Sequence, residues 1–130
     1  MASIDLFTYG TLMFPEVITA VIGRKVESCE MCLPGWRRFA LNGRLYPGAV
    51  RDPAQKIIGV CCRKLSPKDL EKLDRFEGAE YARVATDYVE AGVHIEVYAW
   101  LDIRLAARED WSPERFKERH LKDYLRTIEP

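Results

Sequence analysis

The residue of this sequence best placed to do chemistry is a carboxylate beside an apolar helix face. Glu77 follows a short segment in which Leu70, Leu73 and Phe76 recur at spacings of three, and Gly78 comes directly after it. A carboxyl group pressed toward an apolar core is harder to ionise, so its pKa rises toward the range that suits proton transfer. Most glutamates instead point to solvent, and the spacing alone leaves both interpretations open.

A second candidate feature is the four-residue segment Tyr9, Gly10, Thr11 and Leu12, which follows the first apolar run of the chain. A glycine directly after a strand lets the backbone turn and expose consecutive N–H groups. Such a concavity holds a carboxylate or an oxyanion. The same pattern also fits a plain turn, so the segment by itself is weak evidence for a site.

The residues before Glu77 carry a clear helix start. Ser66 is a typical N-cap, Pro67 suits the first helical position, and Asp69 places an acid in the first turn. Gly78 is where a residue of positive φ can stop the helix. We therefore predict a helix that begins at the Ser66 cap and brings Glu77 to its C-terminal end.

The remaining elements point to an α+β class. Turn signals at Pro34-Gly35, Asn42-Gly43 and Ala91-Gly92 separate runs that are rich in β-branched and aromatic residues. We predict strands at 4–9, 25–33, 36–41, 46–50, 57–65, 84–89 and 94–101, and further helices at 15–22 and from Trp111 to Ile128. Many short strands with interspersed helices predict one domain, residues 1–130, with a small mixed β-barrel and flanking helices.

Composition excludes several classes of function. The 130 residues contain 20 basic and 20 acidic side chains, so no excess of charge suggests binding to nucleic acid or to an anionic membrane. The N-terminus lacks the pattern of a secretory signal, and no apolar stretch is long enough to span a bilayer. We expect a soluble, cytoplasmic protein that acts as a monomer.

Four cysteines raise the question of a metal or redox site. Cys29 and Cys32 are spaced as a C-x-x-C pair, but Cys61 and Cys62 are adjacent, and both histidines are isolated. A redox pair would open a helix, whereas this pair lies in a predicted strand. We therefore expect no metal site and interpret the four residues as reduced thiols of the core.

Taken together, these segments resemble the γ-glutamylcyclotransferase-like superfamily, in particular its AIG2-like (avirulence-induced-gene-like) and γ-glutamylamine cyclotransferase branch. The likeness spans essentially the whole chain in order. It rests on Phe7 to Leu12, Leu33 to Arg37, Tyr46 to Val50, Gly59-Val60, Leu73 to Gly78, Tyr81 and Arg83, and on Trp111, Phe116, His120 and Tyr124 of the tail.

The resemblance implies a cavity at the mouth of the barrel and assigns roles there. It implies that Glu77 is the general acid/base, that Tyr9 to Leu12 cradle a γ-glutamyl group, and that Tyr46, Pro47 and Tyr81 line the pocket. The family reaction is attack of a γ-glutamyl α-amine on its own side-chain carbonyl, which releases an amine and 5-oxoproline. It needs no cofactor or metal, because nucleophile and electrophile belong to one small molecule.

Two rival functions use the same features. A γ-glutamyl deacylase would apply the same site to another substrate, and a non-catalytic module would bind a γ-glutamyl compound or a carboxylate without turning it over. A binding module has no need of a carboxylate with a raised pKa beside the loop. The presence of Glu77 therefore favours the enzyme.

Overall fold

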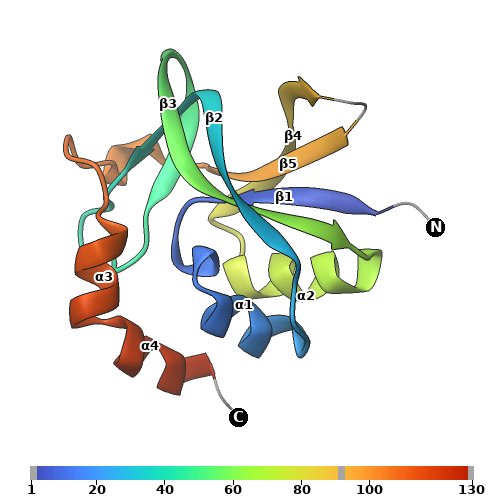
Figure 1. Cartoon of the computed structure of the whole chain (residues 1–130). Helices are drawn as coiled ribbons and strands as arrows, with labels where there is room; N and C mark the ends of the chain where they lie inside the picture. Colours follow the sequence, from blue (N-terminus) through green and yellow to red (C-terminus); the bar gives the residue numbers. More distant parts are fainter. Residues whose placement is uncertain (1–2, 91–92, 129–130) are drawn as a thin grey trace.

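The computed structural model describes residues 3–90 and 93–128. One five-stranded sheet and four α-helices make up the fold (Figure 1). The strands are β1 (Ile4–Thr8), β2 (Ser28–Phe39), β3 (Gly48–Leu65), β4 (Tyr81–Glu90) and β5 (Val93–Trp100). The helices are α1 (Pro15–Ile22), α2 (Pro67–Glu77), α3 (Pro113–Arg119) and α4 (Leu121–Ile128), with short 3-10 turns at η1 (Thr11–Met13) and η2 (Ile103–Leu105). The predicted α+β class is confirmed.

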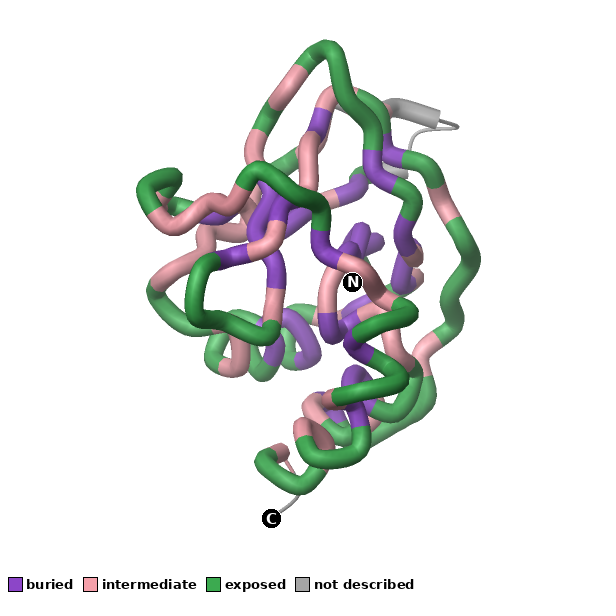
Figure 2. Tube along the Cα trace, turned by 90° about the vertical axis from the view of Figure 1, so that its left-hand side faces the viewer, coloured by how far each residue is buried: buried purple, intermediate pink, exposed green. Residues whose placement is uncertain are grey.

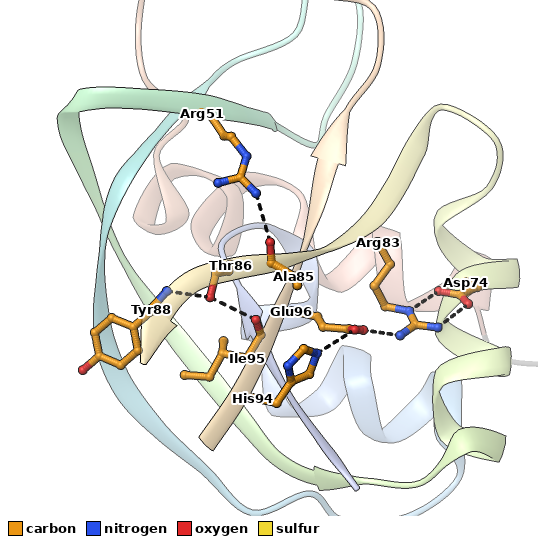
Figure 3. Close-up of polar contacts among 9 residues, drawn as sticks. All are labelled: Arg51, Asp74, Arg83, Ala85, Thr86, Tyr88, His94, Ile95 and Glu96. Atoms are coloured by element: carbon orange, nitrogen blue, oxygen red, sulfur yellow. Dashed lines mark hydrogen bonds and ion pairs between the residues drawn. The ribbon is translucent and has the colours of Figure 1, made fainter. Parts of the chain in front are cut away.

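The sheet is mixed, curled and open. Its order is β2-β3-β1-β5-β4; β1 and β5 run parallel, and the other neighbours are antiparallel. No ladder within the described ranges joins the two edge strands β2 and β4, so the predicted barrel is not closed. A side chain joins two strands across the curl of the sheet: Arg51 of β3 donates to the Ala85 carbonyl of β4 at 3.0 Å (Figure 3).

Two pairs of predicted strands are in fact two long strands. The pieces 25–33 and 36–41 were expected to pair with each other across Pro34-Gly35, and this prediction is wrong. Gly35 takes φ +83°, which a glycine adopts readily, and the chain continues through a bulge as β2. The pieces 46–50 and 57–65 are likewise replaced by β3, which pairs with β2 around the predicted turn at Asn42-Gly43.

The predicted C-terminal helix is also divided. His120 has φ −130° between α3 and α4, which changes the direction of the chain there (Figure 1). The change brings α4 against α1 and lets the Tyr124 hydroxyl approach Thr11 Oγ1 at 3.4 Å. The hairpin predicted at 84–101 is present as β4 and β5, and its turn at Ala91-Gly92 lies outside the described residues.

Both faces of the sheet are covered, as the concentration of buried positions in the middle of the molecule shows (Figure 2). The adjacent residues Leu6 and Phe7 of β1 are both fully buried, one against the helices and the other inside the curl of the sheet. No helix within residues 3–90 and 93–128 is long and apolar enough to cross a membrane.

The cysteines divide by position in the sheet. Cys61 and Cys62 of β3 are buried on opposite faces, and burial raises the pKa of these thiols to about 11 and about 12. Cys29 and Cys32 are exposed, so the prediction that they are core thiols is wrong. They lie on β2, an edge strand whose two faces are less covered than those of β3.

Close packing where β3 crosses β5 leads to a first prediction. A Cβ atom on Gly48 would lie 2.8 Å from Trp100 Cβ and 2.9 Å from Phe39 Cε1. We expect Gly48→Ala to lower stability by about 1–3 kcal/mol, as overpacking does, measured by urea denaturation. Gln55→Ala, at an exposed position of the same strand, should change stability by less than about 0.5 kcal/mol. Equal stabilities of the two variants would contradict the close approach.

Candidate active site

Glu77 owes its position to a well-formed helix. The Ser66 hydroxyl accepts the Asp69 amide at 3.1 Å, and the Asp69 carboxylate accepts the Ser66 amide at 3.0 Å, which completes a capping box. Leu70 and Leu73 bury the apolar face. Gly78, at φ +81°, ends the helix directly after Glu77, as the sequence predicted.

The end of α2 faces a cavity of about 120 Å³ between the sheet and the helices. The eight residues singled out in the sequence all line it, although they come from four separate parts of the chain. The full lining consists of Phe7, Thr8, Tyr9, Gly10, Thr11, Leu12, Tyr46, Pro47, Phe76, Glu77, Tyr81, Tyr98 and Tyr124.

Glu77 has no partner within the described residues, since neither an ion pair nor a hydrogen bond reaches its carboxylate. Loss of water around the carboxyl group and, to a smaller extent, the negative charge of Asp74 raise its pKa to about 8. A carboxyl group of this kind exchanges a proton readily near neutral pH.

The loop after β1 presents three backbone N–H groups in a row. The carbonyl of Tyr9 accepts from Arg38 Nη1 at 2.9 Å, that of Gly10 from the Met13 amide at 3.0 Å, and that of Thr11 from the Phe14 amide at 3.3 Å. In a trans peptide the N–H points opposite to its carbonyl. The next amides along, those of Gly10, Thr11 and Leu12, have no acceptor in the described part of the chain and are free for an anion.

Arg38 fixes this loop from behind. Its guanidinium also binds the Asp110 carboxylate through two bonds of 2.8 and 3.1 Å, it lies over the Trp111 ring, and its side chain is only 10% exposed. Gly10 packs directly against Pro47, since a Cβ atom at position 10 would lie 2.9 Å from Pro47 Cδ. The glycine is therefore needed for close approach rather than for a positive φ.

Tyrosines form most of the remaining wall. The Tyr81 hydroxyl donates to the Pro47 carbonyl at 2.6 Å, and the Tyr9 hydroxyl donates to the Tyr98 carbonyl at 2.6 Å. Burial raises the pKa of the Tyr9, Tyr81, Tyr98 and Tyr124 phenols, so all four stay uncharged around neutral pH. The hydroxyls of Tyr9 and Tyr81 fix the backbone around the cavity, and none of the four phenols adds charge to it.

The family model described as "Gamma-glutamyl cyclotransferase, AIG2-like" matches residues 6–114. The chain belongs to this family. AIG2-like protein A of Arabidopsis thaliana is 32% identical over 132 residues, covering 95% of this chain and 78% of the relative. AIG2-like protein B of the same plant is 30% identical, covering 93% of this chain and 73% of the relative.

Solved structures share the fold of this chain. A solution structure of an Arabidopsis thaliana protein has a TM-score of 0.71 and 30% identity, covering 98% of this chain and 89% of that one. A structure titled "Gamma-glutamyl cyclotransferase" has a TM-score of 0.66 at 16% identity, covering 98% of this chain and 86% of that one. At that identity the second likeness concerns the fold.

Sequence reasoning missed part of this AIG2-like cavity. Phe7 and Thr8 looked like ordinary strand residues, and Tyr98 belonged to a strand with no visible relation to the opening one. Arg38 carries no signal of a role at this site in the sequence. Tyr98 and Arg38 come to the site from distant segments, so no local signal could have identified them. Phe7 and Thr8 directly precede Tyr9 and line the cavity with it. Tyr124 had a weak signal, its place on the apolar stripe of the last helices.

The environment of Glu77 leads to a second prediction. An acid whose pKa is about 4.3 in the unfolded chain and about 8 in the fold binds more protons when folded between those values. Stability therefore falls as pH rises through that window. Glu77→Gln should match the wild type below pH 4 and exceed its stability by about 1–2 kcal/mol above pH 8, less than the full shift because water reaches the cavity.

The measurement is urea denaturation of both proteins at pH values from 4 to 9. Glu71→Gln, an exposed change on the same helix, serves as the control and should show no such trend. A stability difference for Glu77→Gln that does not vary with pH would show that Glu77 titrates as an ordinary carboxyl group.

Proposed function

We propose that this protein is a γ-glutamyl cyclotransferase with Glu77 as its general acid/base. One observation carries the proposal: an unpartnered carboxylate with a raised pKa shares one small cavity with three unpaired amides. A polar group on a cavity wall that lacks a protein partner adds no hydrogen bond to the stability of the free protein. Such groups persist where a ligand completes their bonding, which makes this cavity the candidate site.

The reaction joins two ends of one molecule. The α-amino nitrogen of a γ-glutamyl compound attacks its own side-chain carbonyl carbon, and a five-membered ring closes. The bond from that carbon to the leaving nitrogen then breaks, which yields 5-oxoproline and a free amine. Holding the chain folded accounts for much of the rate, since well-oriented intramolecular reactions reach effective molarities of about 10⁵–10⁸ M.

Glu77 supplies the proton transfers. An α-ammonium group has a pKa of about 8, close to the pKa of about 8 of the Glu77 carboxyl group. Transfer from the ammonium to the Glu77 carboxylate is therefore nearly balanced in free energy and leaves a nucleophilic amine. After the attack, the protonated Glu77 gives its proton to the leaving nitrogen, and the carboxylate so regenerated takes the surplus proton of the ring nitrogen and releases it to solvent.

The amides of Gly10, Thr11 and Leu12 supply the anion site. They suit the substrate α-carboxylate or the oxyanion that forms on the attacked carbonyl, and losing one oxyanion donor typically costs about 3–4 kcal/mol. The cavity holds about 120 Å³, similar to the roughly 150 Å³ that accommodates benzene in an engineered protein. It thus suits the glutamyl head, and the amine portion lies outside.

The acid/base role leads to a third prediction. Glu77→Gln keeps the size of the side chain but cannot accept a proton. We expect it to fold, to bind a γ-glutamyl compound, and to form 5-oxoproline about 10²–10⁴-fold more slowly than the wild type. The measurement is 5-oxoproline release from a panel of γ-glutamyl amines and amino acids.

Two controls make this experiment decisive. Glu71→Gln should keep wild-type turnover, and an N-acetylated substrate should fail with every protein because its nitrogen is no longer a nucleophile. Wild-type rates from Glu77→Gln would refute the acid/base role. Binding of γ-glutamyl compounds by the wild type without any release of 5-oxoproline would identify a binding module instead.

The close contact at Gly10 leads to a fourth prediction. A side chain at this position must displace Pro47 or the amide loop. Gly10→Val should therefore weaken 5-oxoproline binding by about tenfold or more, the value of one charge-assisted hydrogen bond, with Gly10→Ala in between. Calorimetric titration measures the affinity. Ala54→Val, an exposed change, is the control, and unaltered affinity of Gly10→Val would remove the loop from the site.

A further inference from the structure

The last turn of α2 carries two carboxylates with opposite surroundings. Asp74 and Glu77 are three residues apart, so their side chains are neighbours on one helix face. Arg83 of β4 binds both oxygens of Asp74, at 2.9 and 3.1 Å, and the Tyr98 hydroxyl donates to the same carboxylate at 2.7 Å. Glu77 receives no bond from the described residues. The Asp74 carboxylate thus accepts three hydrogen bonds, whereas the Glu77 carboxylate has no donor among these residues and lines the cavity.

The clamp on Asp74 is itself held in place. Arg83 also binds the Glu96 carboxylate of β5, which in turn contacts His94 Nε2 at 3.1 Å (Figure 3). Burial by itself would raise the pKa of Asp74, but the Arg83 guanidinium and the Tyr98 hydroxyl outweigh it and lower this pKa. Asp74 therefore stays ionised throughout the range in which Glu77 titrates.

The other groups that face Glu77 do not compete with this charge. They are the phenols of Tyr9 directly after β1, Tyr81 on β4, Tyr98 on β5 and Tyr124 on α4, all neutral near pH 8 because burial raises their pKa values. The phenol of Tyr46 also lines the cavity, where it bonds with Arg44 and with Glu80. Arg38 lies behind Tyr9, bound to its carbonyl and to Asp110. Within the described residues, Asp74 is thus the charged group that acts on Glu77.

We propose that Asp74 is a positioning residue of this active site, which Arg83 and Tyr98 clamp so that it holds a fixed negative charge against Glu77. Asp74 does not line the cavity and does not meet the substrate. Its charge makes the Glu77 carboxylate more basic, so that it takes a proton from the substrate ammonium more readily. The catalytic consequence rests on the proposed function, whereas the electrostatic coupling does not.

The coupling is tested in the free protein. With ¹³C-carboxyl-labelled glutamate, the Glu77 signal, assigned by its loss in Glu77→Gln, is followed by NMR from pH 4 to 10. We expect Asp74→Asn to lower the Glu77 titration midpoint by about half to one pH unit, a modest change because Asp74 is partly exposed. Asp102→Asn breaks the exposed Arg104 pair, with its bonds of 2.8 and 3.0 Å, and should leave the midpoint unchanged.

A second variant moves the midpoint the other way. Arg83→Gln keeps the Asp74 charge but removes the cation that partly balances it, so the Glu77 midpoint should rise. A purely structural role would weaken the fold of both variants without opposite shifts. An unchanged midpoint in folded Asp74→Asn, or a fall in Arg83→Gln, overturns the proposal.

Kinetics separate this inference from the proposed function. If the wild type releases 5-oxoproline, the rising limb of kcat/KM against pH should shift in each variant in the direction of its NMR midpoint. Opposite midpoint shifts in a protein that turns over no γ-glutamyl compound would support the coupling and refute the proposed function. If the wild type turns over a γ-glutamyl compound and the pH profile of kcat/KM is unchanged in Asp74→Asn, the result supports the proposed function and refutes the coupling.

Discussion

The parallel pairing of β1 with β5 is the constraint on which the rest of the structure depends. β1 lies between β3 and β5, and both of its faces are buried. β3 passes so close that a Cβ atom on Gly59 would lie 2.4 Å from the Thr8 carbonyl oxygen. This close contact fixes the position of the C-terminal end of β1. The loop that follows must leave the sheet beside Tyr98 of β5, and this places Gly10 to Leu12 at the cavity.

Because this frame is rigid, the site can keep unsatisfied polar groups. The amides and the carboxylate that lack protein partners add no hydrogen bonds to the stability of the fold, so the surrounding packing must hold them in place. Here Arg38 holds the Tyr9 carbonyl from outside the cavity, and Tyr81 holds the Pro47 carbonyl on the far wall. These bonds lie behind the cavity and leave its interior donors and acceptor free. The packing thus holds these groups in place without bonding to them.

Two carboxyl groups one helical turn apart lie in opposite environments in this arrangement. Donors surround Asp74, which favours its charged form, and the neighbourhood of Glu77 favours the neutral form. Opposite environments of this kind separate the pKa values of paired acids in many active sites. The helix itself does not cause this difference in pKa, because Asp74 and Glu77 lie on the same face of its last turn. The difference comes from β4 and β5, which bring Arg83 and Tyr98 to one side of α2 only.

The sequence by itself determined the local elements and part of the site. The Ser66 cap, the apolar spacing up to Phe76 and the stop at Gly78 involve neighbouring residues, so the helix and the place of Glu77 at its end were predictable. Continuity of β2 through Gly35 was not, because a glycine of positive φ fits a turn and a bulge equally well, and only long-range pairing with β3 selects the bulge. The break at His120 likewise depends on the packing of α4 against α1. Arg38, Arg83 and Tyr98 gained their positions from strand order, a property that no local spacing encodes.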